Sequence, residues 1–286
     1  MGNRWLSIAI GLILIGVGGA ALFKFNFDDD KKLAQYEKTW TFNAGELNHL
    51  SIDNNYKSTT IRFVKSTDGT NSIAISGREE REIIERMDRT EIANGSLALN
   101  LNEKSEWFNF SFDFAFGAKQ EITVALFDAD GLETLDFDTD SGGLKVYDAV
   151  VASAQFKADS GGIRVDNFAG KRLKLRVDSG GIDGDGIRAE VEASADSGGI
   201  DIKHLTGKSV LSADSGGVKL QKDDTSDADI HTDSGGVRVA LPAAFAGFYD
   251  LQSDSGSIHA PDSKRDTKDY VKVRTDSGGI RIEQQN

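Results

Sequence analysis

A five-residue pattern, Asp-Ser-Gly-Gly followed by an aliphatic residue, recurs through the second half of the chain and constrains its fold more than any other feature. Copies begin at Asp140, Asp159, Asp178, Asp196, Asp214, Asp233, Asp254 and Asp276, and the copy at Asp254 is degenerate, with Ser257 in place of the second glycine. Successive starts differ by 19, 19, 18, 18, 19, 21 and 22 residues. A motif that returns at a near-constant interval indicates stacked structural repeats.

Each repeat has the pattern of two short strands joined by a glycine turn. Ahead of Asp178, residues 173–177 place an apolar side chain at every second position, which is the period of a half-buried strand. Residues 163–165 alternate in the same way after the turn. The glycines permit positive φ, and the aspartate can accept hydrogen bonds from nearby backbone N–H groups. We expect the turns to be shaped by Asp140, Gly142, Gly143, Asp159, Gly161, Gly162, Asp178, Gly180, Gly181, Asp196, Gly198, Gly199, Asp214, Gly216, Gly217, Asp233, Gly235, Gly236, Asp254, Gly256, Asp276, Gly278 and Gly279.

A unit of about 19 residues cannot bury its apolar side alone and must stack on its neighbours. Two strands and two turns per unit fit one coil of a parallel β-solenoid (β-helix), with coils of roughly 18–22 residues stacked about 4.8 Å apart. An antiparallel sandwich of hairpins is the alternative, but it would use two-residue turns rather than one recurring four-residue turn. The sequence therefore predicts an all-β fold, a parallel β-solenoid preceded by one N-terminal transmembrane helix.

Two columns of residues ahead of the turn predict a narrow packed core. The position directly before each aspartate is small, and it holds Thr139, Ala158, Val177, Ala195, Ala213, Thr232, Ser253 and Thr275. The position three residues before the aspartate is mostly larger, and it holds Phe137, Phe156, Leu175, Ala193, Leu211, Ile230, Leu251 and Val273.

The composition excludes several classes of function. The chain has 286 residues and a formal net charge of −13, which argues against nucleic acid as a partner. It has no cysteine, so disulfides, thiolate nucleophiles and cysteine-ligated metal centres are excluded.

The run that begins at Trp5 and ends at Phe23 carries no charge and is bounded by Arg4 and Lys24. As a helix it would span about 28 Å, which is enough to cross a hydrocarbon core. We expect residues 1–24 to be a membrane anchor, with the domain on the periplasmic or extracellular side. A signal peptide that is cleaved to release a secreted protein is the alternative. Residues 25–39 are expected to form a polar linker.

Residues 40–134 are β-like but irregular, and we expect them to form opening coils and a cap ahead of the regular repeats at 135–286. Residues 50–55 resemble a worn copy of the later strand and turn. Residues 78–89 are the one helix-like interruption, with an apolar face. Between Phe108 and Phe116, phenylalanines alternate along one strand face. This strip either covers an end of the core or is exposed to a partner, a glycan or the membrane surface.

In register, the turn aspartates would stack at one strand spacing, where like charges repel. We expect bonds to the turn N–H groups and to the neighbouring serine hydroxyl to compensate, with help from a mostly basic column two residues after the second glycine. That column holds Lys145, Arg164, Lys219, Arg238, His259 and Arg281, with Asp183 and Asp201 as exceptions.

Calcium is the alternative role for the aspartate column, with Asp140, Asp159, Asp178, Asp196, Asp214 and Asp233 as candidate ligands. Calcium-binding rolls carry a nine-residue Gly-Gly-x-Gly-x-Asp pattern, which differs from this one. We therefore expect a structural ladder and no cofactor.

Enzymatic signals are weak. The four histidines, His49, His204, His231 and His259, show no metal-ligand spacing. No serine lies in a Gly-x-Ser-x-Gly nucleophile elbow. Because a motif repeated eight times indicates a scaffold, we expect no catalytic residues. Carboxylates paired on one face of a polysaccharide-active β-helix are kept as the enzymatic alternative.

The chain resembles the bacterial putative-adhesin family with β-strand repeats. The recurring turns carry the resemblance, as does the segment from Leu241-Pro242-Ala243 through Tyr249-Asp250-Leu251 to the turn at Asp254. It covers most of the chain from Trp40 onward and implies a right-handed β-solenoid at the cell envelope, with no catalytic residues to carry over.

We accordingly expect a non-enzymatic cell-envelope protein, a membrane-tethered β-solenoid that acts as an adhesin or scaffold. Its partners would be the membrane, through the run from Trp5 to Phe23, and an envelope protein or glycan. The alternatives are a calcium-stabilised surface module and a polysaccharide-active β-helix enzyme.

Overall fold

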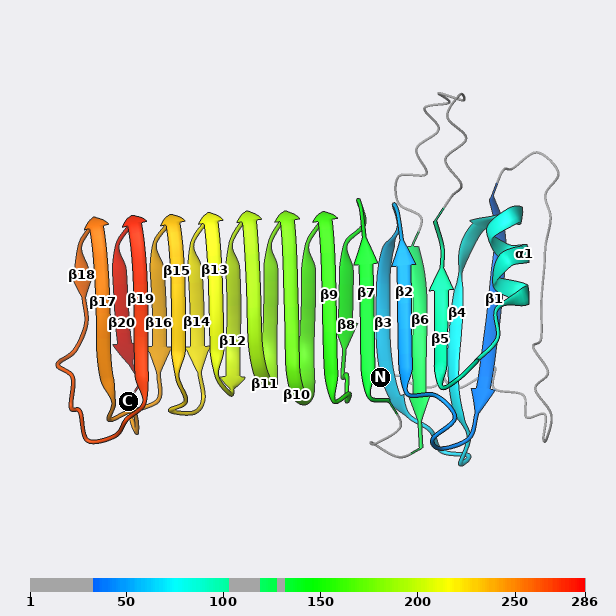
Figure 1. Cartoon of the computed structure of the whole chain (residues 1–286), viewed down its shortest axis with the longest axis horizontal. Coiled ribbons are helices and arrows are strands. Elements are labelled where there is room, and N and C mark those ends of the chain that lie inside the picture. Colours follow the sequence, from blue (N-terminus) through cyan, green and yellow to red (C-terminus); the bar gives the residue numbers. More distant parts are fainter. Residues whose placement is uncertain (1–32, 103–118, 128–131, 286) are drawn as a thin grey trace, which may run out of the picture.

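The structure, a computed structural model, describes residues 33–102, 119–127 and 132–285. Within these ranges the chain forms twenty strands and one helix, and the strands stack as flattened coils along one axis (Figure 1). From β7 onward the strands that stack are parallel and in register, so that Val177 of one coil pairs with Ala195 of the next. The prediction of an all-β, solenoid-like fold with parallel coils is confirmed, and the antiparallel sandwich is excluded.

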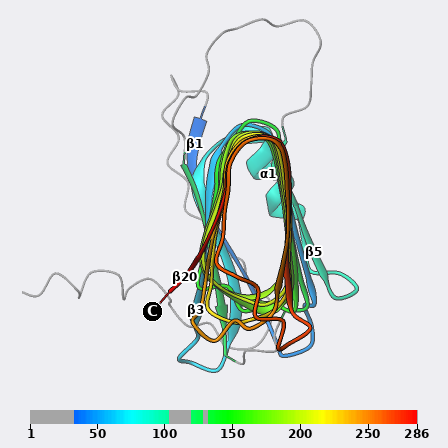
Figure 2. The ribbon, with the colours of Figure 1, turned by 90° about the vertical axis from the view of Figure 1, so that its left-hand side faces the viewer.

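Viewed along the axis, the coils superimpose as a flattened ring with two long sides (Figure 2). We call the side ahead of each turn the pre-turn wall. Its strands, in spatial order, are β5 (Ser96–Asn100), β2 (His49–Asn54), β7 (Thr134–Thr139), β9 (Ser153–Ser160), the later parts of β10 (Ile163–Ser179) and β11 (Ile182–Ser197), β13 (Ser209–Ser215), β15 (Ala228–Ser234), β19 (Tyr270–Ser277) and β17 (Phe248–Ser255).

The opposite side is the post-turn wall. Its strands, in spatial order, are β1 (Leu33–Phe42), β4 (Asn71–Glu80), β6 (Lys119–Leu126), β3 (Ser58–Lys65), β8 (Leu144–Tyr147), the first parts of β10 and β11, β12 (Ile200–Thr206), β14 (Val218–Lys222), β16 (Val237–Leu241), β20 (Ile280–Gln284) and β18 (Ile258–His259).

The two predicted columns form the core between the walls. Phe137, Phe156 and Leu175 are buried one above the other, and the small column beside them is buried as well, from Thr139 to Thr275. Burying a large apolar side chain contributes about 1.5–3 kcal/mol, so each added coil supplies several such increments. The alternation of large and small side chains keeps the ring narrow.

The coils do not follow sequence order at the C-terminal end. Strand β19 pairs with β15 on one side and with β17 on the other, and β20 lies between β16 and β18 in the same way. In space, the last coil of the sequence therefore lies between the coil of β15 and β16 and the outermost coil of β17 and β18. The degenerate turn at Asp254 belongs to the outermost coil, where Ile258 remains 43% exposed.

The N-terminal end repeats this arrangement. Strand β2 lies between β5 and β7, and β3 lies between β6 and β8. The first coil of the sequence is therefore stacked between the second and the third. Strand β2 is in register with β7, which confirms that residues 50–55 are a worn copy of the repeat. Two antiparallel pairings, of β4 with β1 and with β6, extend the post-turn wall beyond the parallel coils.

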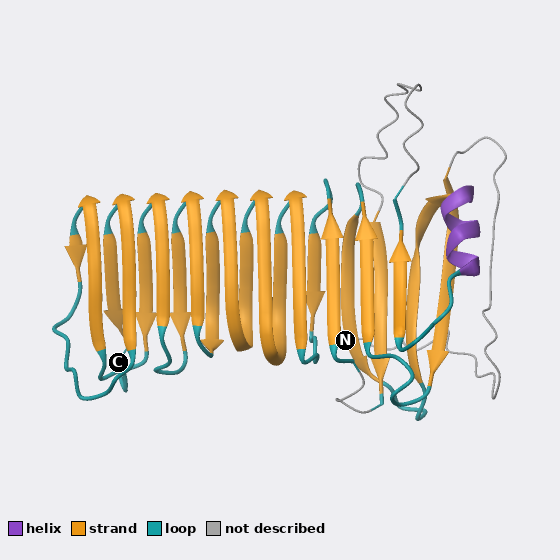
Figure 3. Ribbon diagram, viewed as in Figure 1, coloured by secondary structure: helices purple, strands orange, loops and turns teal. Residues whose placement is uncertain are grey.

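Helix α1 (Arg81–Arg89) covers this end of the fold (Figure 3). It lies within the helix predicted over residues 78–89, because residues 78–80 still belong to β4. Its apolar face, Ile83, Ile84 and Met87, is buried as expected. The Lys38 ammonium of β1 donates hydrogen bonds to the Asp88 and Thr90 carbonyl oxygens, which satisfies acceptors at the helix C-terminus.

Several expectations fall at or beyond the limits of the described residues. Strand β1 begins at Leu33, so residues 33–39 belong to the β-structure and not to the polar linker expected there. Within the described ranges, no helix is long and apolar enough to cross a bilayer. The predicted transmembrane run and the alternating phenylalanines between Phe108 and Phe116 both lie outside the described residues. The right-handed sense of the coils stays a prediction.

Candidate ligand-binding groove

The turn motif places its aspartates in one row along an edge of the coils. The serines that follow them pair across neighbouring coils, for example Ser179 with Ser197 and Ser234 with Ser277, so the preceding aspartates are in register too. The row therefore runs through the turns in the spatial order of the coils, with the turn at Asp276 between those at Asp233 and Asp254.

Some aspartates of this row pair with a basic side chain two residues before them. Lys157 Nζ lies 2.7 Å from Asp159 Oδ1, and Arg176 Nε lies 3.3 Å from Asp178 Oδ1. Arg176 also reaches the next coil, with Nη2 at 3.7 Å from Asp196 Oδ2. Contacts along and between coils thus offset the repulsion within the row.

The prediction that the turn N–H groups donate hydrogen bonds to the aspartates and so compensate their charge is wrong. The amide N–H of Gly180 donates to the Ser197 carbonyl oxygen of the next coil at 3.0 Å, not to its own aspartate, because backbone pairing along the stack takes the turn amides first. The basic column, which was predicted to pair with the aspartates, does not pair with this row among the described residues either. Its members project from the post-turn wall, where Arg164 pairs with Asp166 at 2.8 Å.

The two glycines of each turn have different roles. A β-carbon on the first glycine would meet the backbone of the neighbouring coil, 2.0 Å from Gly216 O in the case of Gly235 and 2.3 Å from Gly161 O in the case of Gly180. Real β-carbons do not approach backbone atoms this closely, so stacking requires glycine at the first position.

The second glycine is not required in this way. A β-carbon on Gly236 would lie 3.5 Å from Gly279 O, an ordinary contact, whereas one on Gly199 or Gly217 would lie 3.1 Å or 3.0 Å from the carbonyl oxygen of the next coil, which is tight but well short of the clash at the first position. In the outermost coil Ser257 takes this position while Gly256 is kept at the first. Stacking therefore requires glycine strictly at the first position and less strictly at the second, and at Gly236 it leaves room for a side chain.

These second glycines line a groove that runs along the axis over six coils. Its volume is about 710 Å³. The lining includes the backbone of Gly199, Gly217, Gly236 and Gly279, together with the charged side chains two residues further on. At about 4.8 Å per coil, the groove extends over about 24 Å.

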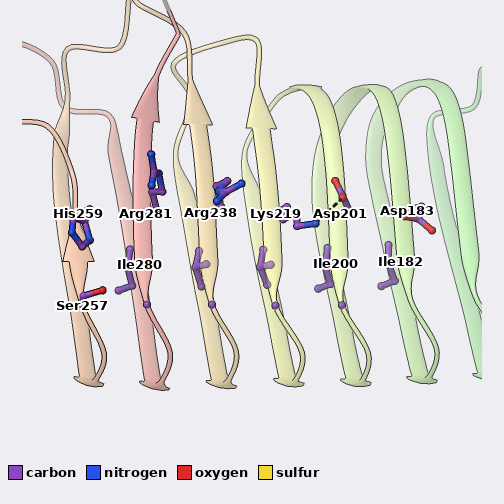
Figure 4. A pocket seen from close by; sticks show the side chains of 16 residues that line it. Ile182, Asp183, Ile200, Asp201, Lys219, Arg238, Ser257, His259, Ile280 and Arg281 are labelled. Carbon is purple, nitrogen blue, oxygen red and sulfur yellow. Dashed lines mark ion pairs between the residues drawn. The ribbon is translucent and has the colours of Figure 1, made fainter.

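The charged side chains of the groove divide it into two ends (Figure 4). Asp183 and Asp201 form one end. The other end holds the cations Lys219, Arg238 and Arg281 in the spatial order of the coils, followed by His259. The inserted last coil thus places Arg281 between Arg238 and His259, which both precede it in the sequence.

The cations of the groove are only partly neutralised. Lys219 Nζ lies 3.8 Å from Asp201 Oδ2, Arg281 pairs with Glu283 on its own strand, and Arg238 has no ion pair among the described residues. Lys219 and Arg281 are 68% and 60% exposed, so they are free to turn toward a ligand.

The pre-turn wall differs because several of its cations are matched across coils. Lys174 pairs with Glu192 at 2.7 Å, and Lys272 pairs with Asp229 at 3.0 Å. A regular surface of stacked coils can therefore neutralise itself, and the cationic end of the groove does not.

Backbone donors add to the groove. The amide N–H groups of Gly199, Gly217, Gly236 and Gly279 make no hydrogen bond within the described part of the chain. In the same turns, the first-glycine and aliphatic N–H groups are paired with the next coil, as for Gly198 with Ser215 O and Ile200 with Gly217 O. Unpaired backbone N–H groups beside cations are donors suited to anions.

Calcium binding by the aspartate row stays a prediction. Across the described ranges, no group of three or more histidine, aspartate or glutamate side chains is arranged to hold a metal ion. The sequence identified every charged residue of the groove but assigned the column to charge compensation. The sequence signal for the groove is the second glycine, which recurs even where stacking leaves room for a side chain, as at Gly236 and Gly279.

Comparisons with known proteins identify a family and structures to which the chain is similar. The model of the Toastrack DUF4097 family matches residues 47–284. The crystal structure of a putative adhesin from Bacteroides fragilis is 14% identical, with 87% of this chain and 97% of that chain covered and a TM-score of 0.50. A putative adhesin from Parabacteroides merdae is 11% identical, with 90% and 98% covered and a TM-score of 0.38. No curated protein shows significant sequence similarity to the chain.

Proposed function

This chain belongs to the Toastrack DUF4097 family, and we propose that it is a non-enzymatic, adhesin-like binding module of the cell envelope. The single observation that carries this proposal is the groove, in which one set of residues, repeated coil after coil, forms a continuous surface. A surface built by repetition suits the binding of an extended partner, whereas an active site requires reactive groups assembled once.

The glycines of the groove support this interpretation. Stacking leaves room for a side chain at Gly236 and Gly279, and Ser257 occupies the equivalent position in the outermost coil, so glycine at these positions keeps the surface open. The fold likeness to the Bacteroides fragilis putative adhesin agrees with a binding role, which we extend to this chain as part of the proposal.

We further propose that the run from Trp5 to Phe23 anchors the protein in the membrane, with the β-coils on the periplasmic or extracellular side. Its 19 uncharged residues are the support for this placement. The partner that the coils meet there would be an envelope protein or a glycan.

A sedimentation assay tests the binding role. The full-length chain, purified in a mild nonionic detergent, is mixed with isolated envelope fragments of its source bacterium and pelleted. We expect saturable co-sedimentation that weakens when Arg238 and Arg281 are both replaced by glutamate. Absence of saturable binding, or binding that the double substitution leaves unchanged, would contradict the proposal.

A further inference from the structure

We propose that the cationic end of the groove binds a linear acidic polysaccharide, with the negative groups of the polymer over Lys219, Arg238 and Arg281. The inference deepens the proposed function and rests on it, since it names the chemical class of the ligand for the same groove. The bound chain would lie along the axis of the coils.

The geometry suits a ligand with anionic groups at intervals along a narrow chain. From Lys219 to Arg281 the cationic end covers three coils, or about 10 Å at the strand spacing of about 4.8 Å. Arginine guanidinium groups bind carboxylates and sulfates through two parallel hydrogen bonds, and Arg238 is available for such a contact because it has no ion pair in the described residues.

The glycine strip provides for the uncharged part of such a ligand. Without side chains at Gly217, Gly236 and Gly279, a sugar ring can approach the backbone, and its hydroxyl oxygens can accept hydrogen bonds from the unpaired amides. Asp183 and Asp201 would repel the same polymer, so the acidic end would limit how far the chain extends along the groove.

Other polymers fit less well. Single-stranded nucleic acid is usually held by large aromatic side chains on which bases stack, and no Phe, Tyr or Trp of the described residues lines the groove. The net charge of −13 further opposes a polymer as densely charged as a nucleic acid. The lack of large aromatic side chains also argues against a neutral glycan held by ring stacking.

The side-chain spacing of an acidic peptide does not match the spacing of the coils. In an extended peptide, side chains on one face recur about every 6.7 Å, whereas the cations of the groove recur about every 4.8 Å. Over the two steps from Lys219 to Arg281 the mismatch grows to about 4 Å, most of one coil spacing. A peptide of alternating charge therefore cannot match more than one or two of these cations.

Calorimetric titration of the full-length chain in nonionic detergent tests the inference. The probes are an oligogalacturonate, which carries carboxylates, a chondroitin sulfate oligosaccharide, which also carries sulfates, and a neutral dextran of similar length. We expect one or both acidic probes to bind, the dextran not to bind, and the affinity to fall as salt is added. The two acidic probes distinguish carboxylate from sulfate as the recognised group.

Matched variants locate the binding site. Arg238→Glu with Arg281→Glu should lower the affinity by at least about tenfold, because two charge-assisted contacts become repulsive. Lys171→Glu with Arg172→Glu changes the net charge by the same amount at exposed positions outside the groove, and should leave the affinity within about twofold. Arg238→Gln, a milder change, should give an intermediate loss while the urea midpoint of unfolding stays constant.

Each result decides for or against the inference. A loss confined to the groove variants supports it. An equal loss in the Lys171/Arg172 control would overturn it, since binding would then follow net charge alone. Failure of both acidic probes would also overturn it, and the proposed function would stand if envelope fragments still bound in a manner that depends on Arg238 and Arg281.

Discussion

The carbonyl oxygen of Gly216 lies 2.0 Å from the position that a β-carbon on Gly235 would occupy. A β-carbon on the neighbouring Gly236 would lie 3.5 Å from its nearest contact, the carbonyl oxygen of Gly279. Two adjacent glycines of one turn therefore have different roles: Gly235 allows the coils to stack, and Gly236 keeps the groove open.

Alanine substitutions should separate these roles. Gly235→Ala forces a methyl group into the backbone of the next coil, so we expect it to lower the free energy of unfolding by roughly 1–3 kcal/mol or more. Gly236→Ala meets no backbone clash and restricts the unfolded chain, so we expect anything from no change to a gain of about 0.5 kcal/mol. Urea unfolding measures both, and equal losses in the two variants would contradict the assignment.

The ion pairs of the fold should differ sharply in their contribution to stability. Glu79 of β4 is fully buried and pairs with Lys57, whereas Glu192 of β11 is exposed where it pairs with Lys174. Glu79→Gln leaves a poorly hydrated ammonium behind, and we expect it to cost about 3 kcal/mol. Glu192→Gln should change stability by less than about 0.5 kcal/mol. Similar values for the two variants in urea unfolding would refute the distinction.

Tyr36 should make the fold sensitive to alkali. Burial raises the pKa of its phenol above the ordinary value of about 10, the hydrogen bond from Gln120 opposes that shift, and nearby Glu79 adds to it. In the unfolded chain the phenol ionises near pH 10, while in the folded chain it stays protonated. Its stabilising contribution is therefore complete below about pH 10 and falls above it, by up to about 1.4 kcal/mol per pH unit.

Tyr36→Phe provides the control for this effect. The phenylalanine variant loses the hydrogen bond with Gln120 at every pH, but it should lack the additional decline of the wild type above about pH 10. The measurement is the free energy of unfolding of both proteins between about pH 8 and pH 11. Parallel curves above pH 10 would show that Tyr36 ionises freely in the folded protein.

The regular coils could be predicted from sequence because one period determines them. The alternation at residues 173–177 fixes which side chains point inward, and the interval between turns fixes which strands pair. Helix α1 could be found for the same reason, since Ile83, Ile84 and Met87 interrupt the strand period with a helical one. These features depend on local pattern, which a single sequence records.

The order of the end coils could not be predicted in this way. The repeat period is the same whether the coil of Asp276 is stacked beyond the coil of Asp254 or before it. The choice depends on long-range packing, in which the degenerate coil with Ser257 takes the outermost place. The groove escaped prediction for a related reason, because Arg281 joins Arg238 only through that order of the coils.

Engineered cysteines would test this coil order, on which the groove depends, and the absence of native cysteines makes the experiment clean. Ser234 of β15 is in register with Ser277 of β19, whereas Ser255 of β17 pairs with the far side of β19. Neighbouring strands lie about 4.8 Å apart, within the Cα separation of about 4.4–6.8 Å that a disulfide allows.

Formation of a disulfide under mild oxidation is therefore the most direct measurement, read as a mobility shift and by mass spectrometry of peptides. Ser234→Cys with Ser277→Cys should crosslink in the folded protein, and Ser234→Cys with Ser255→Cys, two coils apart, should not. The reverse result, a crosslink between positions 234 and 255 and none between 234 and 277, would place the coils in sequence order and separate Arg238 from Arg281.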